Sequence, residues 1–185
     1  FFAHRNLSHL IMSGVFERFP ELKYVMTEQG VAWVLEDLRR MDGYHYQMSS
    51  GRVGELGFPA ELLLPDKPSE YFDRNVWIGA SFPSPSEAEA IRKVGVHKVM
   101  WGSDYPHHEG TFPYNREHLR RSFSDWDEAD LRTIFTDNAV EVYRFDADAL
   151  APLAARIGPS VAEVATPLDE ADIPRDALSP AFTRP

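Results

Sequence analysis

The densest group of polar side chains in the sequence is the run Trp-Gly-Ser-Asp-Tyr-Pro-His-His-Glu-Gly, from Trp101 to Gly110. It follows a short apolar stretch that is typical of a buried β-strand. In parallel α/β folds, catalytic side chains gather at the carboxyl ends of the strands. A carboxylate there, Asp104, could ligate a divalent metal or accept a proton from metal-bound water. The alternative is that Asp104 caps a turn in a proline-containing loop.

Two other positions could contribute to the same site. His107 and His108 are adjacent and must point in different directions, so we expect at most one of them, His107, to face Asp104. Glu28 follows another predicted strand, which would place it at the same edge of the sheet. It could bind metal or substrate, or it could be a carboxylate stabilised by the dipole at a helix N-terminus. The predicted site is therefore Asp104, as metal ligand and proton acceptor, with Glu28 and His107 beside it.

The elements that must position these residues alternate between strands and helices. The predicted strands are Leu22–Thr27, Asn75–Ser81 and Val96–Ser103, and the predicted helices are Phe1–Arg18, Val31–Met41, Ser84–Val94, Arg116–Phe123 and Glu128–Tyr143. Ser84 or Ser86 is the expected N-cap of the helix that follows the second strand. Strands separated by helices of this length indicate parallel βαβ units with right-handed crossovers. The fold class is therefore α/β. Three such units are too few to close an eight-stranded barrel, which typically takes ~250 residues, so the pattern fits either a fragment of a barrel or a small open sheet.

The two ends of the chain carry different signals. The sequence opens Phe1-Phe2-Ala3-His4 without an initiator Met, within what reads as an amphipathic helix. We therefore expect a chain truncated at its N-terminus. Residues 146–185 contain six Pro, seven acidic residues and three Arg. This composition predicts a C-terminal extension to a domain that spans residues 1–145, with one helix at Asp148–Ile157 and an extended, partly disordered surface tail beyond Pro159.

Composition excludes several classes of partner. The formal net charge of −10 argues against nucleic acid and against an anionic membrane surface. No apolar run approaches the roughly 18 residues of a membrane-spanning helix. There are no Cys residues, which excludes disulfides and thiolate chemistry and fits a cytoplasmic protein. The expected partner is a small-molecule substrate.

Four segments together resemble the amidohydrolase-related family, which includes aminocarboxymuconate-semialdehyde decarboxylase and related hydrolases. They are Ser13–Lys23, Val25–Trp33, Leu38–Asp42 and Trp101–Thr111, in the right order over about residues 1–145. The resemblance implies a distorted (β/α)8 TIM barrel of which this chain holds the last three βα units. It also implies one divalent metal, often zinc, with Asp104 at the position of the family's last ligand. The other ligands, an early His-x-His and a His after a middle strand, would lie upstream of Phe1.

One position departs from that pattern. Where decarboxylase-like members carry a His before a Gly, this chain has Gln29 before Gly30, and Gln is a poor zinc ligand compared with imidazole. Our hypothesis is a metal-dependent hydrolase or decarboxylase that acts on a small carboxylated or cyclic substrate, inactive as this fragment alone. The family often forms dimers, so a homodimer is an option for the full-length protein. The alternatives are a non-catalytic, barrel-derived binding module, or a metal-free enzyme that uses Asp104 and Glu28 as a carboxylate pair.

Overall fold

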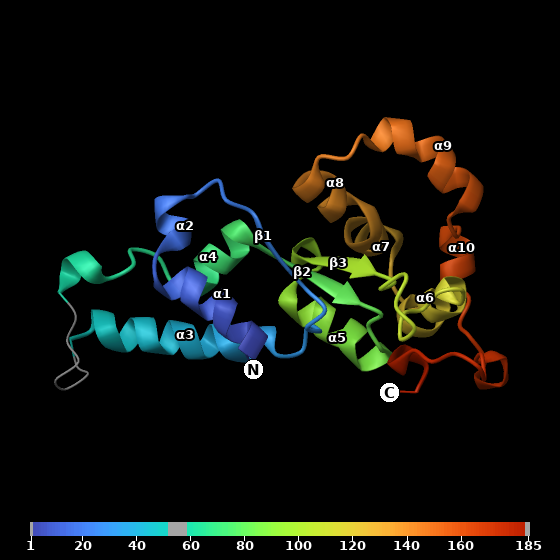
Figure 1. Cartoon of the computed structure of the whole chain (residues 1–185), viewed down its shortest axis with the longest axis horizontal. Coiled ribbons are helices and arrows are strands. Elements are labelled where there is room, and N and C mark those ends of the chain that lie inside the picture. Colours follow the sequence, from blue (N-terminus) through green and yellow to red (C-terminus); the bar gives the residue numbers. More distant parts are fainter. Residues whose placement is uncertain (1, 52–58, 184–185) are drawn as a thin grey trace.

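The computed structural model describes residues 2–51 and 59–183, which form an α/β arrangement around a small sheet (Figure 1). The strands are β1 (Tyr24–Thr27), β2 (Val76–Ser81) and β3 (Val99–Gly102). The helices are α1 (Phe2–Met12), α2 (Val15–Arg18), α3 (Val34–Ser49), α4 (Pro68–Asn75), α5 (Pro85–Val94), α6 (Asn115–Phe123), α7 (Glu128–Arg132), α8 (Asn138–Tyr143), α9 (Ala147–Ile157) and α10 (Val161–Val164). No helix of the described residues is both long enough and apolar enough to cross a membrane.

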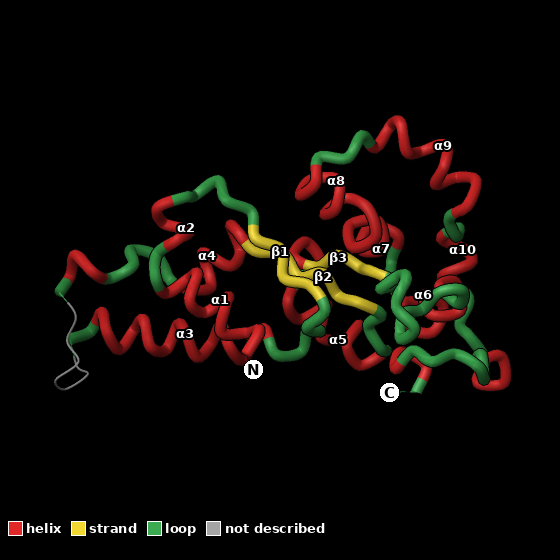
Figure 2. The backbone as a smooth tube through the Cα atoms, viewed as in Figure 1, coloured by secondary structure: helices red, strands yellow, loops and turns green. Residues whose placement is uncertain are grey.

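The strands pair in parallel in the order β1-β2-β3, as the alternation of strands and helices predicted. Thr27 lies opposite Gly79, and Ser81 lies opposite Gly102, so the three carboxyl ends meet at one edge of the sheet. Figure 2 shows the three strands side by side between two groups of helices. A parallel pairing requires a crossover between strands. Helices α3 and α4 supply the first crossover and α5 the second.

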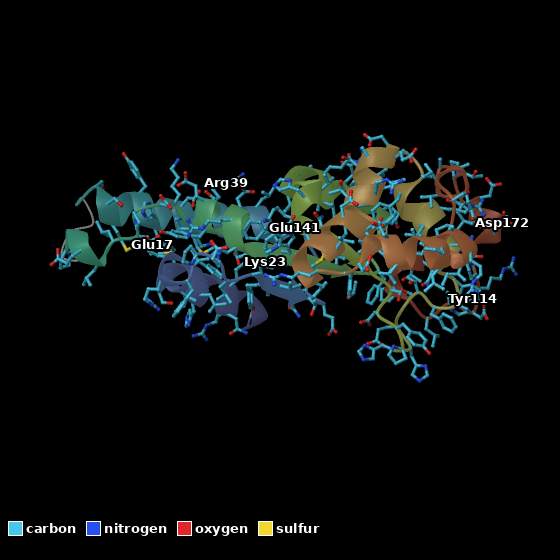
Figure 3. All side chains as sticks on the ribbon, turned by 90° about the horizontal axis from the view of Figure 1, so that it is seen from above. Glu17, Lys23, Arg39, Tyr114, Glu141 and Asp172 are labelled. Atoms are coloured by element: carbon cyan, nitrogen blue, oxygen red, sulfur yellow. The ribbon has the colours of Figure 1, made fainter. Side chains whose placement is uncertain are left out.

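The two faces of the sheet differ because side chains alternate along a strand. Met26, Ile78 and Val99 belong to the main hydrophobic core, which they share with the surrounding helices. The other face carries Trp77, whose ring lies 4.0 Å from Lys98 Nζ and 5.2 Å from Lys23 Nζ. Lys23 in turn pairs with Glu141 of α8 at 3.1 Å, and the two residues lie close together in Figure 3. This second face therefore combines an aromatic ring with charged groups.

Buried asparagines fasten the amino ends of two strands. Asn75 donates through Nδ2 to the carbonyls of Pro20 and Leu22, just before β1, at 2.8 Å each. Asn138 donates in the same way to the carbonyls of Val96 and Val99 at 2.7 Å each. Buried carbonyls without partners are costly, so each amide stabilises the chain where it enters a strand.

Several predicted boundaries are wrong. The predicted helix Phe1–Arg18, of which residue 1 lies outside the described range, breaks at Gly14, which has a φ of 72° and separates α1 from α2. Helix α3 continues past Met41, its predicted end, through Gly43 to Ser49, because one glycine costs a helix only about 1 kcal/mol. Residues 52–58 lie outside the described residues. Strand β3 is shorter than predicted, since residues 96–98 form a 3₁₀ turn.

The prediction of an extended surface tail after Pro159 is wrong in part, although most of these residues do lie at the surface. The segment forms α10 and further 3₁₀ turns at Glu170–Asp172 and Pro180–Phe182. Ser179, Ala181 and Phe182 are at most 5% exposed. Composition pointed to an extended chain because it does not report the hydrogen-bonding partners that α6 provides. The Ser84 cap of α5 is confirmed, since its side chain accepts from the N–H of Glu87.

Candidate functional site

The carboxyl edge of the sheet has unusual backbone geometry. Glu28 directly follows β1, Phe82 directly follows β2 and Asp104 lies two residues beyond β3, and their φ angles are 63°, 39° and 63°. These are three of the four non-glycine residues with positive φ among the described residues. Such conformations cost about 1–3 kcal/mol each and cluster at functional sites. The edge is therefore a candidate site on backbone geometry alone.

Hydrogen bonds hold this geometry in place. The N–H of Glu28 donates to the carbonyl of Gly79 at 3.2 Å, and the N–H of Phe82 donates to the carbonyl of Gly102 at 2.8 Å. Each strand end is thus tied to the next strand at the point where its chain turns. The left-handed turns direct the residues that follow the strands over the edge of the sheet.

Three side chains that the sequence predicted for the site come together here. Ligand atoms of Glu28, Asp104 and His107 all lie within 4.8 Å of one another. His107 Nδ1 lies 3.2 Å from Asp104 Oδ2, and the Asp104 side chain is 9% exposed while that of His107 is 55% exposed. The hydrogen bond to Asp104 raises the pKa of His107, and the charge of the same carboxylate adds to the effect. His108 is not part of the cluster, as expected for adjacent residues.

The loop that carries Asp104 and His107 is closed by backbone contacts. The N–H of His107 donates to the carbonyl of Asp104 at 2.9 Å, and the N–H of Gly110 donates to the carbonyl of His107 at 3.1 Å. The N–H of Thr111 returns to the carbonyl of Ser103 at 2.9 Å. A Cβ on Gly110 would lie 2.6 Å from the Ser103 carbonyl oxygen and 3.0 Å from those of Asp104 and His107. Only glycine fits this closure without displacement of the loop.

A cavity of about 400 Å³ opens beside the cluster. The residues that line it are Glu28, Gln29, Gly30, Ser81, Phe82, Glu87, Asp104, Glu109 and Pro180. Four of these are carboxylates and none is Lys or Arg, so the cavity favours a cation. Phe82 and Pro180 supply apolar surface. The cavity can therefore hold a metal ion with a small molecule beside it.

Sequence analysis did not assign three of these lining residues to the site. Glu87 lies in the first turn of α5, which follows β2 and so reaches the same edge. Glu109 lies in the loop after β3, just beyond the two histidines. Pro180 belongs to the segment that we expected to be an extended tail, and no spacing in the sequence connects it to the strands.

His118 is a buried support for this edge that no motif revealed. It is fully buried on α6 and lies between β3 and the loop after β2. Trp101 Nε1 donates to its Nδ1 at 3.4 Å, which leaves the proton on Nε2, 2.8 Å from the carbonyl of Pro83. The neutral imidazole thus links β3 to the residue after Phe82. Burial lowers the pKa of His118 to about 4, with the hydrogen bond to Pro83 opposing and the Arg121 charge reinforcing the shift.

We expect this histidine to make the fold sensitive to acid. In the unfolded chain the imidazole takes up a proton near the ordinary histidine pKa of 6.5, whereas in the folded chain it does so only near pH 4. The unfolded state then binds more protons, so stability falls as pH drops from 6.5 towards 4, by a total of about 3 kcal/mol. Urea unfolding at pH 7.5, 5.5 and 4.5 should show this loss. His118→Gln, which does not titrate, should have a flatter profile; an unchanged profile in that variant would refute the assignment.

The chain was compared with known proteins. The model of a family described as amidohydrolase matches residues 3–145. No curated protein matches the chain. Among solved structures, an amidohydrolase from Mycobacterium avium subsp. paratuberculosis K-10 is similar, with a TM-score of 0.59 and 29% sequence identity over 74% of this chain.

A second similar structure is a dihydroxybenzoic acid decarboxylase from Polaromonas sp. JS666, solved with manganese and the inhibitor 2-nitroresorcinol. Its TM-score is 0.54 and its identity is 20% over 77% of this chain, so it supports the fold alone. The chain spans 32% of the length of the first protein and 41% of the second. Both similar proteins are therefore much longer than the part matched here.

Proposed function

This chain belongs to the amidohydrolase family, and from that membership we propose that it contributes the carboxyl-terminal part of a metal-dependent hydrolase or decarboxylase. The observation that carries the proposal is the convergence of Glu28, Asp104 and His107 to within 4.8 Å at the carboxyl edge of a parallel sheet. That edge is where α/β enzymes place their chemistry. The substrate class is a small carboxylated or cyclic molecule.

The donor set suits a divalent metal. Two carboxylates and one imidazole match the oxygen and nitrogen ligands of zinc and manganese, which bind at about 2.0–2.2 Å. Ligand atoms within 4.8 Å of one another need to move by less than about an ångström to surround such an ion. The carboxylates around the cavity favour the cation further, since none of the described residues that line it is Lys or Arg. A bound metal would supply Lewis acidity and lower the pKa of water at the site.

The residues of the chain have distinct roles in this proposal. Asp104, which is largely buried, is the principal ligand and the acceptor of a proton from the attacking or departing group. Glu28, which follows β1 on the other side of β2, supplies the second carboxylate of the site. His107 is half exposed and orients Asp104 through its 3.2 Å contact, or joins the metal directly. Gln29 lines the cavity, and in this proposal its amide donates a hydrogen bond to a substrate carboxylate or carbonyl.

We further propose that the three strands are the last three of a distorted (β/α)8 barrel. The support is the coverage of only 32% and 41% of the similar structures, together with outer edges of β1 and β3 that have no partner among the described strands. The face with Trp77, Lys23 and Lys98 would then line the barrel interior. Remaining metal ligands would come from the missing strands. A homodimer of the full-length protein stays a proposal on family grounds.

The test is turnover by the native polypeptide that contains this chain. It should be loaded with Mn²⁺ or Zn²⁺ and supplied with dihydroxybenzoic acid, with CO₂ release as the readout, and in parallel with a cyclic amide or lactone. Turnover of either kind that stops on chelation and returns with metal supports the proposal. The 185-residue chain alone should bind metal without turnover, because the other ligands are absent.

Two outcomes favour the alternatives. Turnover that persists without metal would support Asp104 and Glu28 acting as a carboxylate pair. No turnover together with no metal binding would support a non-catalytic binding module. In either case the metal-dependent mechanism would be abandoned.

A further inference from the structure

The C-terminal segment lies against α6, the helix that follows the site loop. In Figure 1 the last, red part of the chain runs beside α6 and α5 at the end of the sheet towards which the strand arrows point. The family match ends at residue 145, so this segment lies outside it. The contacts that hold this segment beside the site must therefore be found within the chain, and most of them come from α6.

Three arginines of α6 bind the segment at successive points. Arg116 contacts Glu163 at 2.6 Å and the carbonyls of Ile157 and Gly158 at 2.9 and 3.3 Å. Arg120 donates to the carbonyls of Thr166 and Pro167 at 2.9 and 3.0 Å. Arg121 donates to the carbonyl of Ala181 at 3.3 Å. Since backbone carbonyls of an irregular segment lack partners of their own, these guanidinium groups fix the path of the chain.

The last turn is the most firmly seated part. The ring of Phe182 packs edge-on against His118 and Tyr114, with centroids 6.2 and 6.5 Å apart. Tyr114 also donates through its hydroxyl to Asp176 at 2.7 Å. Ser179 is fully buried and caps the turn through a 3.4 Å bond from the N–H of Ala181. Between these anchors, Pro180 lines the same cavity as Glu28 and Asp104.

We propose that the turn at Pro180–Phe182 is a wall of the active site, and that Pro180 is a specificity-determining residue which limits the space beside the metal. This inference deepens the proposed function and rests on it. Proline suits the role because its ring has no polar atoms and its fixed φ holds the surface in place. Phe82 also lines the cavity and adds apolar surface to it. The two would flank the apolar ring of a small cyclic substrate.

The absence of Cys from the chain allows a direct test. Pro180→Cys is modified either with a small methylthio group or with a bulky nitroxide spin label, and Pro167→Cys, at an exposed proline of the same segment, is the matched control. Mn²⁺ should strongly broaden the signal of a nitroxide at position 180 and broaden that of a nitroxide at position 167 less. In an Asp104→Ala background, Mn²⁺ should broaden neither signal. At position 180, the bulky adduct should fill the space beside the metal. It should therefore lower the water-proton relaxivity of bound Mn²⁺ at least twofold compared with the methylthio group. The pair at 167 should show no such difference.

The possible results separate the two proposals. If Mn²⁺ binds in an Asp104-dependent manner but the adducts at 180 and 167 behave alike, the wall is refuted and the metal site stands. If Mn²⁺ does not bind, the metal site fails and the wall falls with it. Phe182→Ala, which removes the anchor of the turn, should weaken the broadening at position 180 while Mn²⁺ affinity is retained; a loss of Mn²⁺ affinity in that variant would contradict a role limited to the wall.

Discussion

Replacement of Asp104 by Ala should lower the affinity of the chain for Mn²⁺ or Zn²⁺ by more than about 100-fold. Removal of partners that merely orient a ligand costs 10–100-fold, and Asp104 is a direct ligand in our account. Its side chain is only 9% exposed, contacts His107 and lies near Glu28. Turnover by the native polypeptide should fall in parallel.

Calorimetry and thermal unfolding with and without metal measure this effect. A metal that binds only the folded state raises the unfolding temperature, so the stabilisation should vanish in the variant. Asp125→Ala, an exposed carboxylate whose partner is Arg92, is the matched control and should keep the metal response. If Asp104→Ala binds metal as tightly as the unmodified chain does, Asp104 is not a metal ligand.

Substitution of Gly110 by Ala should damage the site without touching a ligand. The added Cβ would lie 2.6 Å from the Ser103 carbonyl oxygen and 3.0 Å from those of Asp104 and His107, so the loop must open. Overpacking of this kind costs about 1–3 kcal/mol in the free energy of unfolding. Because displacements of about half an ångström disturb a metal site, metal affinity should fall by about 10-fold or more.

Gly43 provides the control for this substitution. It lies inside α3, and a Cβ there would meet nothing within 4 Å. Gly43→Ala should stabilise the chain by about 0.5–1 kcal/mol and leave metal affinity unchanged. Denaturant unfolding and metal titration of both variants check the pair. Equal effects at positions 110 and 43 would show that the loop closure at Gly110 does not shape the site.

The main elements of the site follow from the order of strands and polar residues. Parallel strands separated by helices place their carboxyl ends at one edge, so Glu28 and Asp104 were expected to meet there, and the structure brings them together. The adjacent pair of histidines allowed only one to join them, and His107 does. The proximity of these residues was predictable because it depends on strand direction and local spacing, whereas their roles remain predictions.

The remaining features depend on contacts that are distant in sequence. Pro180 reaches the cavity because arginines on α6 bind the tail, and His118 is buried because Trp101 and Pro83 satisfy both of its nitrogens. Neither arrangement has a local pattern. The extension of α3 through Gly43 is the opposite case, in which a local signal misleads. Glycine disfavours a helix, but its cost is small and the helix continues through it.

The central claim is that the cluster of Glu28, Asp104 and His107 holds one divalent metal ion. The most direct measurement is elemental analysis, with calorimetric titration, of the chain after exposure to Mn²⁺ and Zn²⁺. Our account predicts about one ion per chain, lost in Asp104→Ala and weakened in Glu28→Gln and His107→Ala. An absence of bound metal in the unmodified chain, or binding that all three variants retain, would contradict it.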